Sequence, residues 1–269
     1  MSLARLMNYP FVTNALVVGV LVALCAALLG VILVLKKYSL IGHGLADVGF
    51  ASLSLALALN LPPILVSAPV VILASVAIMA VSQRKGVAGD VAIGIAATSA
   101  LAIGIVITAV TRGFNIDVYD YMFGSILSVE GSDILLSLAL AAVVIGLFAL
   151  TYNRLFLITC DEDFACACGI NVTMYQFLIS LLTAFVVVIG MRLMGTLLIS
   201  SLIIFPAVTA RRLVKSFKAL VLLASAVSVV CFVVGLFLSF ALNLPTGAAI
   251  VAANLAAMLL SFGAARVKG

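Results

Sequence analysis

Long uninterrupted runs of apolar residues restrict most strongly what this chain can fold into. The first run, at 11–35, ends at Lys36 and Lys37. A helix of about 20 apolar residues crosses the roughly 30 Å hydrocarbon core of a bilayer, since each residue advances about 1.5 Å. Strands of a membrane β-barrel would instead alternate over about 10 residues. The runs at 11–35 and 172–190 do not alternate, so the sequence predicts membrane-spanning helices.

The composition agrees, because 66% of the 269 residues are hydrophobic and only 9% are charged. We therefore predict one all-α integral membrane domain over 1–269, a bundle of eight or nine helical spans. No small-residue cleavage site follows the first run, so we interpret it as a retained span rather than a signal peptide. Polar, glycine and proline residues separate the expected spans, which are 11–35, 40–60, 63–83, 90–111, 133–152, 172–190, 195–210, 219–242 and 246–265. The short interruption at 191–195 is the weakest boundary, either a tight turn or a break in one longer element.

The distribution of basic residues predicts the orientation, since cytoplasmic loops carry the excess of lysine and arginine. With the N-terminus outside, eleven of the 14 basic residues fall inside, and only Arg5, Arg112 and Arg192 fall outside. The C-terminus is then cytoplasmic and the chain lies in the cell membrane. Because the basic residues lie between spans, the net charge of +5 does not indicate nucleic-acid binding.

Two polar segments are longer than turns. The outer one, 112–132, contains aromatic residues typical of the membrane interface. Its Asp117 and Asp120 could concentrate cations or contact a basic patch on a protein that delivers them. Solvation and helix capping explain these acids equally well. The inner one, 153–171, is expected to be a cytoplasmic loop with a short helix that begins at its acidic residues and stops at Gly169.

His43 and Asp47 are the residues most indicative of function. Asp47 lies about seven residues into an apolar span, where a charge costs roughly 2.5–3.5 kcal/mol. His43, the one histidine in the chain, precedes it by four residues and so shares its helix face. An imidazole with a carboxylate suits zinc, manganese or ferrous iron. Small neighbours such as Gly42 and Gly44 would let other helices approach, which predicts an inward-facing metal site.

A hydrogen bond between His43 and Asp47 that pins two helices together, without a metal, is the alternative. Other residues carry weaker hypotheses. Cys160, Cys166 and Cys168 could relay metal, although small residues on a docking helix explain them as well. Arg192 and Gly195 at the outer break, and Pro206 within the seventh span, are candidates for a path or hinge.

Two other functional classes fit parts of the sequence. An ATP-independent secondary carrier would often show inverted repeats and broken helices. An intramembrane protease would need paired aspartates, and Asp90 and Asp120 fall at or beyond span ends. No phosphate-binding loop of the form G-x-x-x-x-G-K-[ST] is present, so any ATP hydrolysis belongs to another chain.

Four stretches together resemble the permeases of zinc, manganese and iron ABC importers. They are 39–50 (SLIGHGLADVGF), 121–128 (YMFGSILS), 161–170 (DEDFACACGI) and 190–207 (GMRLMGTLLISSLIIFPA). In that family a carboxylate precedes the metal-binding imidazole by four residues. Here the order is reversed, with His43 at the aspartate position and Asp47 at the histidine position.

The resemblance implies a type II ABC importer transmembrane domain that works as a homodimer. It further implies two ATPase subunits and an external metal-binding lipoprotein or periplasmic protein as partners. The metal is the substrate, and no permanent cofactor is expected. The segment that touches the ATPase resembles 161–170, which assigns coupling roles to Asp161, Glu162, Asp163, Phe164, Ala165 and Gly169.

Overall fold

The protein is a bundle of long helices, seen in a computed structural model that describes residues 10–82, 89–111 and 131–268. Within these ranges there are ten helices and no strand. Nine of the helices are long and apolar enough to cross a membrane, which confirms the predicted spans. The helices are α2 (Pro10–Leu35), α3 (Ile41–Ala58), α4 (Pro63–Ser82), α5 (Gly89–Val110), α7 (Gly131–Cys160), α8 (Glu162–Ala167), α9 (Val172–Met194), α10 (Thr196–Leu213), α11 (Phe217–Leu242) and α12 (Thr246–Lys268).

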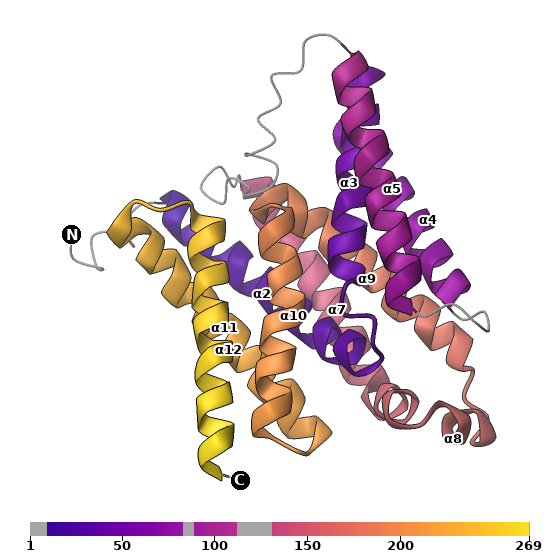
Figure 1. The fold of residues 1–269 in the computed structure, drawn as a ribbon, viewed down its shortest axis with the longest axis vertical. Helices are drawn as coiled ribbons and strands as arrows, with labels where there is room; N and C mark the ends of the chain where they lie inside the picture. The colour runs from indigo at the N-terminus through magenta and orange to yellow at the C-terminus, as the bar shows by residue number, and fades with distance from the viewer. Residues whose placement is uncertain (1–9, 83–88, 112–130, 269) are drawn as a thin grey trace.

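Helix α2 lies in the middle of the bundle and packs against α7, α9, α10 and α11. Helices α3, α4 and α5 form a group on one side of it, while α11 and α12 lie on the other side (Figure 1). Most of α2 and α9 is buried, whereas less than a third of α4, α5, α7 and α12 is fully buried. These exposed surfaces suit contact with lipid, because a helix that is apolar on all sides needs no aqueous face.

Close backbone approach holds the centre of the bundle together. A Cβ atom added to Gly30 in α2 would lie 2.1 Å from the carbonyl oxygen of Ile203 in α10. A Cβ on Gly104 in α5 would similarly meet Phe50 and the backbone of Ala51 in α3. Lipid is as apolar as a leucine side chain, so tight contact at small residues is a main source of helix association in membranes.

One helix is longer than the sequence predicted. The fifth span was expected to end at 152, but α7 continues to Cys160. Asn153 and Arg154, which marked the expected end, are exposed on the helix, while Leu155 and Ile158 continue its buried face. The Arg154 guanidinium reaches the Tyr175 hydroxyl of α9 at 2.5 Å. A long side chain can thus carry its charge away from an apolar helix face without ending the helix.

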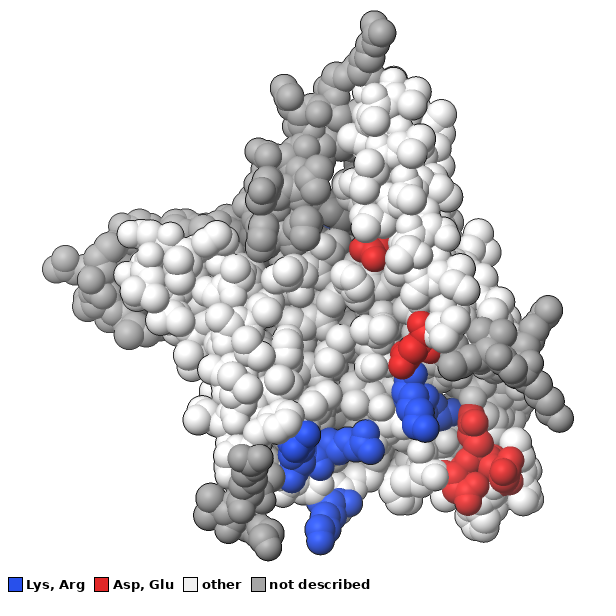
Figure 2. Space-filling model, viewed as in Figure 1, with Lys and Arg blue, Asp and Glu red and all other residues white. Residues whose placement is uncertain are grey.

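Charged side chains gather at one end of the bundle. On the face shown in Figure 2, most acidic and basic atoms lie along the lower edge, over α8 and neighbouring helix ends. We call this end the α8 end; it also holds the turn between α2 and α3, because Lys36 contacts Glu162 of α8 there. The opposite end carries the α9–α10 break and the start of α7. An ion pair between Arg192 and Asp133 connects these two elements.

Candidate metal site and coupling segment

His43 and Asp47 lie on one stripe of α3, as their four-residue spacing predicts. Nε2 of His43 is 3.8 Å from Oδ2 of Asp47. This separation exceeds the length of a hydrogen bond, so the alternative of a hydrogen-bonded pair pinning two helices is not what the structure contains. The His43 side chain is 61% exposed and that of Asp47 is 16% exposed. One chain thus places an exposed imidazole and a largely buried carboxylate side by side, both of types that bind metals.

Neighbouring glycines show which helices flank this stripe. A Cβ on Gly42 would contact Ile203 of α10, and a Cβ on Gly44 would contact Ile93 of α5. His43 lies between these glycines in sequence, and Asp47 is one turn further along. The pair therefore opens between α5 and α10, on the part of α3 that neither helix covers.

The pair does not form a complete metal site within one chain. Among the described residues, no group of three or more histidine, cysteine, aspartate or glutamate side chains is arranged to hold a metal. His43 belongs to the first turn of α3, so the pair lies toward the α8 end rather than at the middle of the span. A metal held by this pair would need further ligands from water, from another molecule, or from both.

Helix α8 has the start and stop that the sequence predicted. The Asp161 side chain caps it by accepting a hydrogen bond of 3.0 Å from the Phe164 amide, and Glu162 and Asp163 occupy its first turn. Gly169 ends the segment with φ of +78°, a left-handed conformation that costs glycine nothing. Ala165 is fully buried beneath the helix, whereas Phe164 is 55% exposed. This exposed aromatic ring on a rigid six-residue helix is suited to contact with a partner protein.

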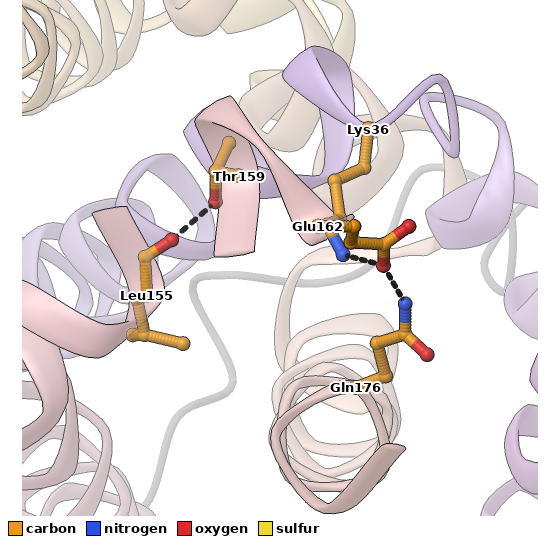
Figure 3. Close-up of polar contacts among 5 residues, drawn as sticks. All are labelled: Lys36, Leu155, Thr159, Glu162 and Gln176. Atoms are coloured by element: carbon orange, nitrogen blue, oxygen red, sulfur yellow. Dashed lines mark hydrogen bonds and ion pairs between the residues drawn. The ribbon is translucent and has the colours of Figure 1, made fainter. Parts of the chain in front are cut away.

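A polar corner ties α8 to two other elements. Nζ of Lys36, just after α2, lies 2.6 Å from Oε1 of Glu162. The same oxygen accepts a hydrogen bond from the Gln176 side chain of α9 (Figure 3). The Lys36 side chain is only 9% exposed, so this ion pair is shielded from water on its basic side. We call Lys36, Glu162 and Gln176 the α8 corner.

Sequence reasoning missed Lys36 and Gln176 as partners of α8. The two residues of the ion pair are 126 positions apart, and no local pattern connects them. Tyr38 also lies close by: burial, and then the Glu162 carboxylate, raise the pKa of its phenol. Its ring lies against the start of α5, where a Cβ on Gly89 would be 2.4 Å from it.

The candidates for a path or hinge lie elsewhere. Gly195 separates α9 from α10 with φ of +84°, so the weakest sequence boundary is a break between two helices. Arg192 at this break lies 3.6 Å from Asp133. Pro206 is buried inside α10, which continues past it to Leu213. Asp117 and Asp120 fall outside the described residues.

The five cysteines are free thiols. Cys160, Cys166 and Cys168 are exposed near α8, while Cys25 and Cys231 are buried in spans. Among the described residues, the three exposed thiols do not join acids or His43 in a group that could hold a metal ion. The structure therefore adds nothing to the hypothesis of a metal relay at these positions.

Comparison with known proteins decides the family. The model of the ABC 3 transport family matches residues 8–265. The chain belongs to this family. It is 30% identical over 255 residues to the manganese import system permease protein ScaB of Streptococcus gordonii, covering 95% of this chain and 91% of that protein. It is 27% identical to the high-affinity zinc uptake system membrane protein ZnuB of Haemophilus influenzae, covering 92% and 95% of the two chains.

A solved structure supports the same conclusion for the fold. PsaBC from Streptococcus pneumoniae in complex with Fab has a TM-score of 0.83 and 29% sequence identity to this chain, covering 96% of this chain and 93% of that one. The family resemblance and the helical membrane fold predicted from the sequence are thus confirmed. The predicted role as the permease of an ABC transporter is confirmed as well.

Proposed function

We propose that this permease imports a divalent transition metal ion, manganese or zinc before iron, through a path on which His43 and Asp47 bind the ion. The observation that carries the proposal is the pair of donors on α3, an exposed imidazole 3.8 Å from a largely buried carboxylate, open between α5 and α10. The relatives named as manganese and zinc import proteins support the choice of metal. Nitrogen and oxygen donors serve all three metals.

Two copies of the chain would complete the site. Each copy supplies one imidazole and one carboxylate, and two copies facing each other supply the four ligands that zinc prefers. The 61% exposure of the His43 side chain supports this arrangement, because a ligand shared between two molecules has to be accessible on each of them. A transit site also has to release its ion, which a pair of weakly held donors favours over a closed cage.

The energy for transport would come from a separate ABC ATPase that docks at α8. Phe164 supports this assignment as an exposed aromatic ring on a capped helix, with Asp161, Asp163, Ala165 and Gly169 fixing the helix around it. An external metal-binding protein would deliver the ion at the opposite end, where Arg192 and Gly195 lie. We propose that the outer acids Asp117 and Asp120 take part in this delivery. Alternating access then follows from rigid-body movement of the spans, with Pro206 as a candidate hinge.

The α8 end would face the cytoplasm, together with the C-terminus. Seven described basic residues belong to this end, namely Lys36, Lys37, Arg154, Arg211, Arg212, Lys215 and Lys218. Cys166 and Cys168 are exposed there and provide a direct test. A membrane-impermeant maleimide should label them in inside-out vesicles and not in intact cells; labelling in intact cells would reverse the orientation.

Metal uptake by cells that carry single substitutions tests the site. His43→Ala and Asp47→Ala should each reduce uptake of radioactive manganese or zinc to background while the permease remains in the membrane. Asp90→Ala is the matched control, since it removes an exposed acid from the first turn of α5 outside the stripe. Normal uptake by both His43→Ala and Asp47→Ala would remove the site assignment.

A further inference from the structure

A cavity of about 640 Å³ opens at the α8 end, and its lining comes from α2, α7, α10, α11 and the turn that joins α10 to α11. Leu35 is the last residue of α2, Cys160 the last of α7, and Phe217 the first of α11. The ends of spanning helices lie near the lipid headgroups, because the length of a span matches the thickness of the bilayer. The cavity therefore opens at headgroup depth.

One side of the cavity is basic. Arg211 belongs to the last turn of α10 and Lys215 to the turn that follows, and both side chains are exposed. Neither forms a salt bridge with any carboxylate in the described part of the chain. Ser216, beside them in the lining, adds a hydroxyl group. Two cations and a hydroxyl group in one lining are the groups that a phosphate would contact.

The other side of the cavity is apolar and aromatic. The ring of Phe156 in α7 lies 5.2 Å from that of Phe217, and the ring of Tyr152 lies 5.6 Å from it. Leu35, Val214 and Leu220 complete the apolar side of the lining. We call Phe156 and Phe217, with Tyr152 in contact with Phe217, the aromatic row.

We propose that this cavity binds an anionic phospholipid, with the phosphate on Arg211 and Lys215 and an acyl chain along the aromatic row. A basic rim above an apolar wall is the pattern of headgroup sites between spanning helices. A water-soluble partner such as the ATPase could reach the basic rim. An anionic phospholipid carries both a phosphate for the rim and an acyl chain for the apolar lining, which favours the lipid as occupant.

Native mass spectrometry of the purified full-length chain in detergent tests the proposal. Dioleoyl phosphatidylglycerol should bind at least ten times more tightly than dioleoyl phosphatidylcholine, which has the same acyl chains and no net charge. The double variant Arg211→Gln with Lys215→Gln should weaken phosphatidylglycerol binding about thirtyfold, at about fivefold for each basic residue near a membrane surface.

The matched control is Lys37→Gln with Lys218→Gln, which removes two exposed charges outside the cavity lining. It should change phosphatidylglycerol binding by no more than about twofold. Equal losses in the two double variants would overturn the proposal in favour of nonspecific charge attraction. Displacement of the lipid by glycerol 3-phosphate at equal concentration would also overturn the proposal. Glycerol 3-phosphate has no acyl chain to contact the aromatic row. The double variant Arg211→Gln with Lys215→Gln could instead bind the lipid normally but no longer hold an ATPase chain. That result would assign the surface to a protein partner.

Discussion

The α8 corner and the His43–Asp47 pair lie at the same end of the molecule, yet they are built in opposite ways. In the corner, a lysine that is 9% exposed lies 2.6 Å from Glu162. In the pair, a histidine that is 61% exposed lies 3.8 Å from its carboxylate. The first arrangement resists displacement, and the second leaves room for a ligand. A transporter needs both, because force has to pass through a fixed contact while the cargo has to enter and leave its site.

A short turn connects the two regions. Lys36 follows α2, and α3 begins at Ile41. The Tyr38 amide donates a 2.8 Å hydrogen bond to the Leu33 carbonyl, and that of Lys37 donates to Val34, which fixes the turn to the end of α2. We therefore expect a displacement of α8 to reach the start of α3 through Glu162 and Lys36.

Exchanging the two donors gives the largest expected effect. His43→Asp alone leaves no imidazole in the chain, and Asp47→His alone leaves no carboxylate on the stripe, so each should lose at least nine-tenths of metal uptake. The double variant His43→Asp with Asp47→His restores the ligand set one turn apart and should recover most of it. Uptake assays in cells with equal amounts of permease measure this. If the double variant is as inactive as the single variants, the order of the two donors along α3 matters, and the site does not tolerate a shift of each donor by one turn.

Removing the exposed ring of α8 should uncouple transport. Phe164→Ala is expected to weaken ATPase binding about thirtyfold, the usual result of truncating an aromatic anchor worth about 2 kcal/mol. Transport-linked ATP hydrolysis should fall with it, while the chain remains folded. Phe185→Ala is the control, since this ring is 38% exposed on the spanning helix α9. Retained stimulation of hydrolysis in Phe164→Ala would count against docking at α8.

Neutralising the α8 corner should have a smaller effect. Glu162→Gln keeps the shape of the side chain but removes the charge that pairs with Lys36, which should lower stability by about 1 kcal/mol, given that Glu162 is half exposed. Thermal unfolding in detergent measures the loss, and Asp163→Asn beside it is the control. The charge reversal Lys36→Glu with Glu162→Lys should recover stability and uptake; recovery of neither would separate the corner from coupling.

The turn between the regions gives the smallest effect. Lys37 has φ of +63°, a conformation that is unfavourable for a residue with a side chain. Lys37→Gly should therefore raise stability by about 0.5–1 kcal/mol, seen as a higher unfolding temperature, without changing uptake. A fall in uptake would mean that the stiffness of the turn contributes to transport.

The sequence predicted the parts of this molecule that local patterns determine. Apolar runs predicted the nine spans, the four-residue spacing predicted the shared face of His43 and Asp47, and the acids before Phe164 predicted the capped α8. The continuation of α7 to Cys160 was missed because Arg154 reaches across to Tyr175 instead of ending the helix.

Long-range contacts could not be predicted in this way. The α8 corner joins residues 126 positions apart, and the basic cavity is assembled from the ends of α2, α7, α10 and α11. Each of these residues is ordinary in its local sequence. Lys36 is one of several basic residues at span ends, and only the packing of α8 beneath the turn places Glu162 beside it.

X-ray absorption of the metal-loaded permease tests the central claim most directly. We expect one manganese or zinc ion for every two permease chains, with imidazole scattering in the metal spectrum that disappears together with the ion in His43→Ala. One ion per single chain, or unchanged metal content and imidazole ligation in His43→Ala, would contradict a site shared by two copies of the His43–Asp47 pair.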